Sequence, residues 1–225
     1  MSLLERNQLI DLLAANSFRL GEFTLSSGIR SDYYIDCRTT TLHARGAELT
    51  GRVFLDLFRQ QGWQPRAVGG LTMGADPVVV AVSIISSQAG TPVHGFLVRK
   101  QEKAHGMGRR IEGFQEKGAP VVIVDDVCTT GSSTIQAIQA AREFGFQIVG
   151  VACLVEREEA GGRPAVETVA VPAPFVSIFK SGEIKAAHRK LKQSPPTFAY
   201  SGVCEVCGRP AVTNEPTLRC DVHRT

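Results

Sequence analysis

The chain has 225 residues, a length that fits one large domain or one domain with an appendage. Hydrophobic residues make up 43% of the chain and charged residues 21%, which is ordinary globular composition and argues against a chain that is disordered throughout. The formal net charge is only +3, which is too small a surplus for a general nucleic-acid binder. Any anion binding must therefore come from local clusters of basic side chains.

The sequence also argues against a membrane or secreted protein. The longest apolar run, residues 77–85, is far shorter than the roughly 20 residues that span a bilayer. Glu5, Arg6 and Asp11 place charges where a signal peptide would be apolar. Six cysteines in a chain of this length do not form the framework of a small disulfide-rich domain. We therefore expect a cytoplasmic protein.

Hydrophobic periodicity predicts an α/β fold. We expect helices at about 3–15, 43–61, 75–88 and 131–144, strands at 67–71, 92–98, 121–124 and 148–155, a hairpin or two short strands within 18–38, and a polar loop at 99–113. The strand at 148–155 is expected to close the series. Because strands and helices alternate over about 90 residues, we predict βαβ units that form a parallel sheet covered by helices.

The most informative segment is 121–134, in which an apolar strand is followed by Asp125 and Asp126, a loop of small hydroxyl residues, and a helix. Open parallel sheets bind ligands at this end of their strands. Backbone N–H groups at a helix start suit a phosphate monoester, and Gly131 lets the backbone approach it closely. The two carboxylates suit sugar hydroxyls or the ligand shell of a Mg²⁺ ion. The segment therefore predicts a site for a ribose 5-phosphate, and it lacks the Walker motif.

The segment 121–134 resembles the signature of the type I phosphoribosyltransferases, which use phosphoribosyl pyrophosphate (PRPP). Other segments are similar to the orotate phosphoribosyltransferases within that family, namely FTLSSG at 23–28 with SDYYID at 31–36, RKQEKAHG at 99–106, and VEREEAGG at 155–162. In those enzymes these segments form the N-terminal hood, the mobile catalytic loop and a further loop at the site. The resemblance extends over about residues 3–190.

The resemblance implies a fold and a reaction. The expected fold is the type I phosphoribosyltransferase fold, an α/β structure with a mainly parallel central sheet flanked by helices and a hood at about 1–40. The implied reaction transfers the phosphoribosyl group from PRPP to orotate and gives orotidine 5′-monophosphate and pyrophosphate, a step of pyrimidine (UMP) biosynthesis. The resemblance also implies a homodimer with shared active sites, because the catalytic loop typically reaches into the neighbouring subunit.

The resemblance further implies roles for individual residues. Lys103 and Asp125 are the implied catalytic residues, and Mg²⁺ is expected to be carried mainly by PRPP near Asp125 and Asp126. The implied PRPP-binding residues are Arg99, Lys100, Lys103, His105, Asp125, Asp126, Val127, Cys128, Thr129, Thr130, Gly131, Ser132 and Ser133. The implied orotate-binding residues are Tyr33, Tyr34, Thr129 and Arg157. A basic loop that closes over pyrophosphate would stabilise the transition state and exclude water.

The sequence departs from the family at two positions. Many members have Lys where this chain has Ser26, and another Lys near the position of Met73. Both lysines contact PRPP where they are present, so their absence removes two positive charges from the expected site. Arg30, Arg109 and Arg110 are candidates to compensate.

The C-terminal part differs in composition from the rest of the chain. We expect a main domain at 1–193, a linker at 194–203 and a tail at 204–225. The tail has a C-x₂-C-x₁₂-C-x₂-H pattern formed by Cys204, Cys207, Cys220 and His223. Three thiolates and an imidazole fill a tetrahedral Zn²⁺ shell, which predicts a structural, zinc-knuckle-like site. Unmetallated thiols or a disulfide are the alternative, and the family resemblance does not extend to this tail.

Two other functions compete with the orotate enzyme. One is a phosphoribosyltransferase for another nucleobase, such as a purine, against which Tyr33, Tyr34 and the motif at 99–106 argue. The other is a PRPP-sensing regulator that binds nucleic acid through the tail. We expect no nucleic-acid partner, because the basic and acidic side chains of the tail balance.

Overall fold

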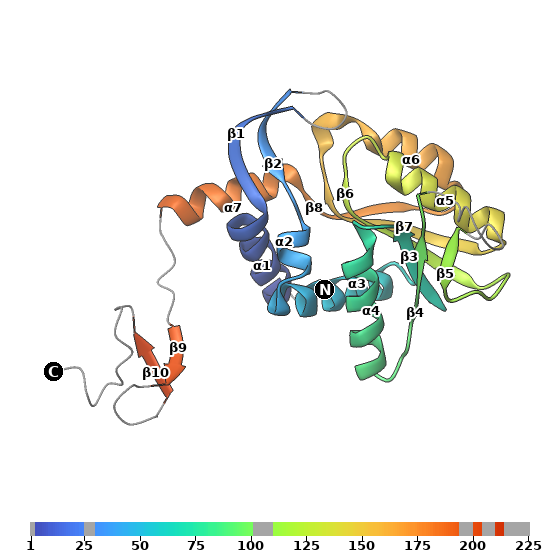
Figure 1. Ribbon diagram of the computed structural model, residues 1–225, viewed down its shortest axis with the longest axis horizontal. Coiled ribbons are helices and arrows are strands. Elements are labelled where there is room, and N and C mark those ends of the chain that lie inside the picture. The colour runs from blue at the N-terminus through green and yellow to red at the C-terminus, as the bar shows by residue number, and fades with distance from the viewer. Residues whose placement is uncertain (1–2, 25–29, 101–109, 194–199, 204–209, 214–225) are drawn as a thin grey trace. The chain divides into compact units, whose positions relative to one another are not determined.

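The central feature of the structure, a computed structural model, is a six-stranded sheet in the order β5-β4-β3-β6-β7-β8 (Figure 1). Its strands are β3 (Ala67–Leu71), β4 (His94–Val98), β5 (Ile111–Gly113), β6 (Pro120–Cys128), β7 (Gln147–Glu156) and β8 (Phe175–Lys180). Neighbouring strands pair in parallel, except that β5 runs antiparallel to β4 at one edge. The structure describes residues 3–24, 30–100, 110–193, 200–203 and 210–213.

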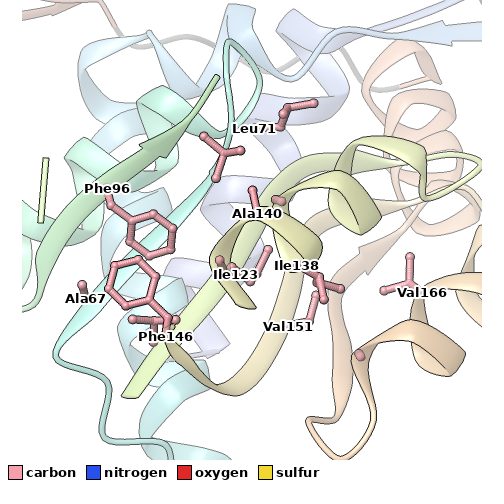
Figure 2. Packing of buried hydrophobic residues seen from close by; sticks show 14 of the residues in the cluster. Ala67, Leu71, Phe96, Ile123, Ile138, Ala140, Phe146, Val151 and Val166 are labelled. Carbon is pink, nitrogen blue, oxygen red and sulfur yellow. The ribbon is translucent and has the colours of Figure 1, made fainter. Parts of the chain in front are cut away.

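Helices cover both faces of this sheet. Helices α3 (Ala44–Gln60) and α4 (Ala75–Gln88) pack together, with α4 against β3, β4 and β6, whereas α5 (Ser132–Phe144) and α6 (Gly162–Ala170) pack against β6, β7 and β8. Figure 2 shows the second of these layers, in which Ile138 of α5 lies beside Ile123 and Val151, while the rings of Phe96 and Phe146 pack against each other in the same cluster. Burial on two faces explains why β6 needs an unbroken apolar run instead of an alternating one.

A hairpin stands outside the sheet and forms the hood. Strands β1 (Phe18–Thr24) and β2 (Arg30–Ile35) pair antiparallel, which confirms the hairpin expected within 18–38. It is flanked by α1 (Leu3–Leu12), which continues as a wider turn over Leu13–Ser17, and by the short α2 (Arg38–Thr41). We refer to β1 and β2 as the hood hairpin.

The C-terminal part begins with α7 (Ser181–Gln193), which follows β8 directly. Beyond it, β9 (Tyr200–Val203) and β10 (Pro210–Thr213) form a separate antiparallel pair. The chain divides into two compact units, Met1–His188 and Arg189–Thr225. Strand β9 begins inside the range that the sequence predicts as linker.

The α/β class and the mainly parallel sheet are confirmed, but two expectations about strands are wrong. The strand at 148–155 does not close the series, because β8 pairs with β7 beyond it. Residues 99–113 are not a loop throughout, because Ile111–Gly113 forms β5. A three-residue edge strand is too short to show periodicity, and β8 mixes polar and apolar residues on a half-covered edge. None of the described helices is long and apolar enough to cross a membrane.

Candidate active site

The candidate site lies at the edge of the sheet where the parallel strands end. The chain places β4 on one side of β3 and then β6 on the other side, so the direction in which the sheet is built reverses between β3 and β6. Ligands of open parallel sheets bind in the crevice at such a switch point, outside the carboxyl ends of the strands. The loops after β3, β6 and β7 therefore form the site, and they contain several of the motifs found in the sequence.

Asp125 and Asp126 lie at this switch point, near the end of β6. Asp125 is 4% exposed, and its Oδ2 accepts a hydrogen bond from the Thr134 hydroxyl of α5 (2.8 Å). Its Oδ1 accepts from the Asp126 N–H (3.0 Å), and Asp126 Oδ1 accepts from the Val127 N–H (2.9 Å). Gly74, after β3, packs so closely that a Cβ atom there would lie 2.4 Å from Asp126 Oδ1. The loop after β3 thus closes directly on the acid pair.

Burial disfavours the ionised form of both carboxyl groups. Desolvation and the neighbouring Asp126 charge raise the pKa of Asp125 to about 7. Desolvation also raises the pKa of Asp126, although the Val127 N–H and the guanidinium of Arg38 oppose that effect. Within the described residues, no basic side chain forms an ion pair with either carboxylate. A cation brought in by a ligand would therefore find an uncompensated acidic site.

The donor set at this site fits a Mg²⁺ ion that arrives with its own ligands. The described residues contain no group of three or more His, Cys, Asp or Glu side chains that could hold a metal ion. Mg²⁺ usually binds proteins through one or two carboxylates and completes its octahedron with substrate phosphates and water. Asp125 and Asp126 supply such a pair, so the structure fits Mg²⁺ bound together with a phosphorylated substrate.

The loop at residues 129–133, which we call the cradle loop, joins β6 to α5. Gly131 has φ +79°, and a Cβ atom there would lie 2.5 Å from Val166 of α6. A Cβ atom on Gly162 would likewise lie 2.3 Å from the Thr129 carbonyl oxygen. Both glycines are needed for the close packing of the cradle loop on the start of α6. The first amides of α5, like those of any helix, have no partners inside the helix, so they can serve a phosphate at this end.

Most of the side chains expected to bind phosphate are exposed on the cradle loop, whereas Cys128, just before it, is buried. Thr130, Ser132 and Ser133 are exposed, and Thr129 is half-buried. Cys128 is buried in the core at the end of β6, so it can offer a phosphate only backbone atoms. Its carbonyl oxygen already accepts a hydrogen bond from the Arg157 N–H (2.9 Å), which joins the cradle loop to the loop after β7.

Two of the residues expected to bind orotate lie together, and one points elsewhere. The guanidinium carbon of Arg157 lies 4.3 Å from the centre of the Tyr33 ring, and both residues are buried. Tyr34, the next residue along β2, is exposed, and its ring lies against Phe23 on the hood hairpin. Alternation along the strand explains the difference, because neighbouring side chains point to opposite faces.

A cavity of about 460 Å³ borders the hood hairpin. Its described lining consists of Glu22, Phe23, Thr24, Arg30, Ser31 and Asp32. The hydroxyl of Ser31 also accepts a hydrogen bond from Arg157 Nη2 (2.8 Å). The cavity wall is thereby connected to the arginine expected to bind orotate.

The basic loop is described only at its two ends. Lys103, His105 and Arg109 lie outside the described residues, as does Ser26 of the hood. Arg99 and Lys100 follow β4, and Arg99 pairs with Glu112 (3.4 Å). Met73, where many relatives have Lys nearby, is exposed in the loop after β3. The four expected metal ligands of the tail, Cys204, Cys207, Cys220 and His223, also lie outside the described residues.

Sequence reasoning missed three residues that the structure places at the site. Thr134 holds Asp125 from α5, Arg38 of α2 is electrostatically coupled to Asp126, and Glu159 contacts both Tyr33 and Arg157. Glu159 lies two residues after Arg157 in the VEREEAGG segment, so that motif was the signal that could have indicated it. Arg38 is held by a bidentate ion pair with Asp36 and has no comparable signal.

Comparison with known proteins agrees with this geometry. The phosphoribosyl transferase domain family matches residues 39–176. The orotate phosphoribosyltransferase of Aquifex aeolicus is 40% identical over 187 residues, which are 82% of this chain and 100% of that protein. The chain belongs to the orotate phosphoribosyltransferase family. The orotate phosphoribosyltransferase of Thermosynechococcus vestitus is 42% identical over 182 residues, covering 80% of this chain and 93% of that protein.

Solved structures of the same family have the same fold. A Mycobacterium tuberculosis orotate phosphoribosyltransferase in complex with Fe(III) dicitrate is 39% identical, with a TM-score of 0.69 over 80% of this chain and 98% of that chain. The same enzyme has been solved in complex with PRPP and is 35% identical in that comparison, with a TM-score of 0.66 over 80% of this chain and 99% of that chain. An adenine phosphoribosyltransferase of Leishmania tarentolae, 13% identical with a TM-score of 0.56, shares the fold alone.

The raised pKa of Asp125 predicts a pH-dependent cost to stability. Between its ordinary value of 3.8 and about 7, the folded chain keeps a proton on Asp125 that the unfolded chain has released. The contribution of Asp125 to stability therefore falls as the pH rises through this window and stays at its lowest above it. Replacing Asp125→Asn should raise the free energy of unfolding at pH 8 by on the order of 2 kcal/mol, and by much less at pH 4.

Urea unfolding from pH 4 to pH 8, without Mg²⁺ or PRPP, measures this difference. The exposed Asp11 of α1 provides the control, and Asp11→Asn should change the free energy of unfolding by less than about 0.5 kcal/mol throughout. If Asp125→Asn raised the free energy of unfolding by the same amount at pH 4 and at pH 8, the prediction would be wrong.

Proposed function

We propose that the chain is an orotate phosphoribosyltransferase, which transfers the phosphoribosyl group of PRPP to orotate in pyrimidine biosynthesis. The bond between ribose C1 and the pyrophosphate oxygen breaks, a bond between C1 and N1 of orotate forms, pyrophosphate leaves, and the proton of orotate N1 passes to pyrophosphate or water. The observation that supports this most strongly is the acid pair formed by the buried Asp125 and the half-buried Asp126, beside the cradle loop at the switch point of the sheet. A phosphate cradle, a diol site and a cation site together fit PRPP.

Each part of PRPP has a proposed place at this site. The 5′-phosphate binds the amides and hydroxyls of the cradle loop, and the ribose hydroxyls donate to Asp125 and Asp126. Asp125 and Asp126 would lie near a Mg²⁺ ion carried mainly by PRPP, which would help to neutralise the charge of the departing pyrophosphate. Arg99, Lys100, Lys103 and His105 stabilise the negative charge that develops on pyrophosphate.

Orotate binds on the hood side. Arg157 pairs with the carboxylate of orotate, because a guanidinium offers parallel N–H groups to a planar anion. Tyr33 and Thr129 contact the ring, and Tyr34, whose side chain points to the other face of β2, contributes backbone atoms only. The hydrogen bond from Arg157 to Ser31, which also lines the 460 Å³ cavity, supports a base site at this boundary.

Lys103 is the residue whose loss should cost most turnover. The Lys103→Ala variant should lower kcat by about 100-fold or more, because a cation aimed at the leaving group acts mainly in the transition state. Orotate consumption with PRPP and Mg²⁺ measures this, and Lys117→Ala is the control. Lys117 is exposed and precedes β6, at the opposite end of the strand from the acid pair.

The same assay on the wild-type protein distinguishes the orotate enzyme from an enzyme for another base and from a PRPP-sensing regulator. Turnover of orotate supports the proposal. Turnover of adenine or another base in place of orotate would move the assignment to that base. PRPP binding without turnover, together with salt-dependent RNA or DNA binding, would favour the regulator.

We also propose that the protein is a homodimer in which the loop at 99–110 acts in the site of the partner subunit. Support comes from Met73, Val80 and Ile84, which are exposed apolar residues on and just before α4. Such a surface fits a subunit interface near the loop after β3.

Mixing two inactive variants tests this sharing. Lys103→Ala and Asp125→Asn should each be inactive alone, whereas their mixed dimer should contain one site with both residues intact. Unfolding and refolding a 1:1 mixture should restore about a quarter of the wild-type activity, because half of the dimers are mixed and each has one complete site. Activity that stays at the level of the separate variants would contradict a shared site.

For the tail we propose a structural Zn²⁺ site formed by Cys204, Cys207, Cys220 and His223. The pairing of β9 with β10, with Val203 opposite Pro210, supports it, because the first two cysteines lie in the six residues that join these strands. Two cysteines spaced C-x₂-C between paired strands are typical of zinc-binding knuckles.

Elemental analysis of the purified protein tests the zinc site. We expect about one Zn²⁺ per chain, and loss of most of it in Cys207→Ser with orotate turnover retained, because a four-ligand site has no open position for catalysis. Cys37→Ala is the control, since Cys37 is buried in the main unit and should not affect the metal content. A wild-type chain with no bound metal would overturn the proposal.

A further inference from the structure

The guanidinium of Arg157 is held in one orientation by two acceptors. Its Nε donates to Glu159 Oε1 (3.2 Å), and its Nη2 donates to Ser31 Oγ (2.8 Å). The side chain is only 3% exposed and packs over the Tyr33 ring. Within the described residues, Nη1 has no hydrogen-bond partner. One edge of the guanidinium is therefore occupied, and the edge that contains Nη1 is available to an anion.

Glu159 connects three separate segments around this arginine. Its carboxylate accepts hydrogen bonds from the Tyr33 hydroxyl of the hood hairpin, from Arg157 Nε, and from the Ser181 hydroxyl at the start of α7 (3.2 Å). Burial by itself would raise the pKa of Glu159, but hydrogen bonds from Tyr33 and Arg157 outweigh it and hold the pKa below its ordinary value. The carboxylate is half-exposed, and it is charged at neutral pH while it accepts these three hydrogen bonds.

This arrangement limits how an acceptor carboxylate can bind. A guanidinium can bind a carboxylate in two parallel ways, through Nε and one Nη or through both Nη groups. Because Glu159 occupies Nε, only the second way remains open at Arg157. Without Glu159, both edges would compete for the carboxylate, and the base could bind in more than one pose.

We propose that Glu159 is a positioning residue for the acceptor base, which fixes Arg157 so that it presents its two Nη groups to the carboxylate of orotate. The inference rests on the proposed function, because it needs a carboxylate on the acceptor. Removing Glu159 loosens the orientation of orotate relative to ribose C1, and misplacement of a reacting atom by about 1 Å can cost up to 100-fold in rate.

The adjacent Glu158 provides a matched control. It has the same side chain, one residue away, and is about as exposed, but its carboxylate pairs with Lys180 (2.6 Å) and, within the described residues, has no hydrogen bond to Arg157, Tyr33 or Ser181. We expect Glu159→Gln to lower kcat/KM for orotate by about ten-fold or more, with KM for PRPP within about two-fold of wild type. Glu158→Gln should leave both constants within about two-fold.

A double-mutant cycle separates positioning from a general loss of structure. A lysine at 157 cannot present two parallel N–H groups, so in an Arg157→Lys background the further change Glu159→Gln should cost less than about two-fold. Additive losses in the cycle would show that Glu159 acts by holding the hood hairpin and not through Arg157, and would overturn the inference. So would equal kinetics for Glu159→Gln and Glu158→Gln.

Two further measurements keep the outcomes distinct. If the wild-type protein does not consume orotate, the proposed function itself is wrong, and the inference about Glu159 falls with it. If the wild-type protein is active and only the comparison of variants fails, the inference alone is wrong. If Glu159→Gln lowers the melting temperature by more than about 5 °C, Ser181→Ala replaces it as the milder variant. Ser181→Ala removes one donor to Glu159, and it should lower kcat/KM for orotate by a smaller factor with the same non-additivity toward Arg157→Lys.

Discussion

Two adjacent carboxylates at the end of a buried strand are the constraint on which the rest of the site depends. Placing Asp125 and Asp126 in the interior costs free energy unless their oxygens find donors. The structure supplies a hydroxyl from Thr134 and backbone N–H groups, but no ion pair from the described residues. The fold thus tolerates an acidic pair that is incompletely compensated, as expected of a site that a bound cation completes.

The opposite side of the site depends on contacts between distant segments. A two-stranded hairpin is at best marginally stable alone, so the hood hairpin needs support from the main unit. Tyr33 stacks on Phe18 at 5.2 Å between ring centres and donates to Glu159, while Asp32 pairs with Lys185 of α7 (2.5 Å). The proposed base site is therefore built from contacts among the hood hairpin, the loop after β7 and α7.

Locality explains which parts of this structure the sequence could predict. The strand, acid pair and cradle loop are consecutive residues, so composition and order are enough to indicate a phosphate site within 121–134. The partners of Tyr33 are not local, since Glu159 lies 126 residues away along the chain. Resemblance could place Arg157 near orotate, but only the fold shows that its Nε is already occupied. Edge strands β5 and β8 escaped prediction because β5 has only three residues and the buried residues of β8 do not alternate with exposed ones.

This chain has Ser26 and Met73 at or near positions where many relatives have lysine, so the site must bind PRPP with two fewer positive charges. Two described arginines at the ends of the basic loop are already paired with acids, Arg99 with Glu112 at 3.4 Å and Arg110 with Glu143 at 3.7 Å. Both pairs are partly exposed, and exposed pairs of this kind contribute only about 0–1 kcal/mol each. A pyrophosphate group offers denser charge than a carboxylate, so exchanging one acidic partner for the other costs little. The acids near the basic loop therefore do not prevent its arginines from serving the leaving group, and this keeps the site chemically consistent without the two lysines.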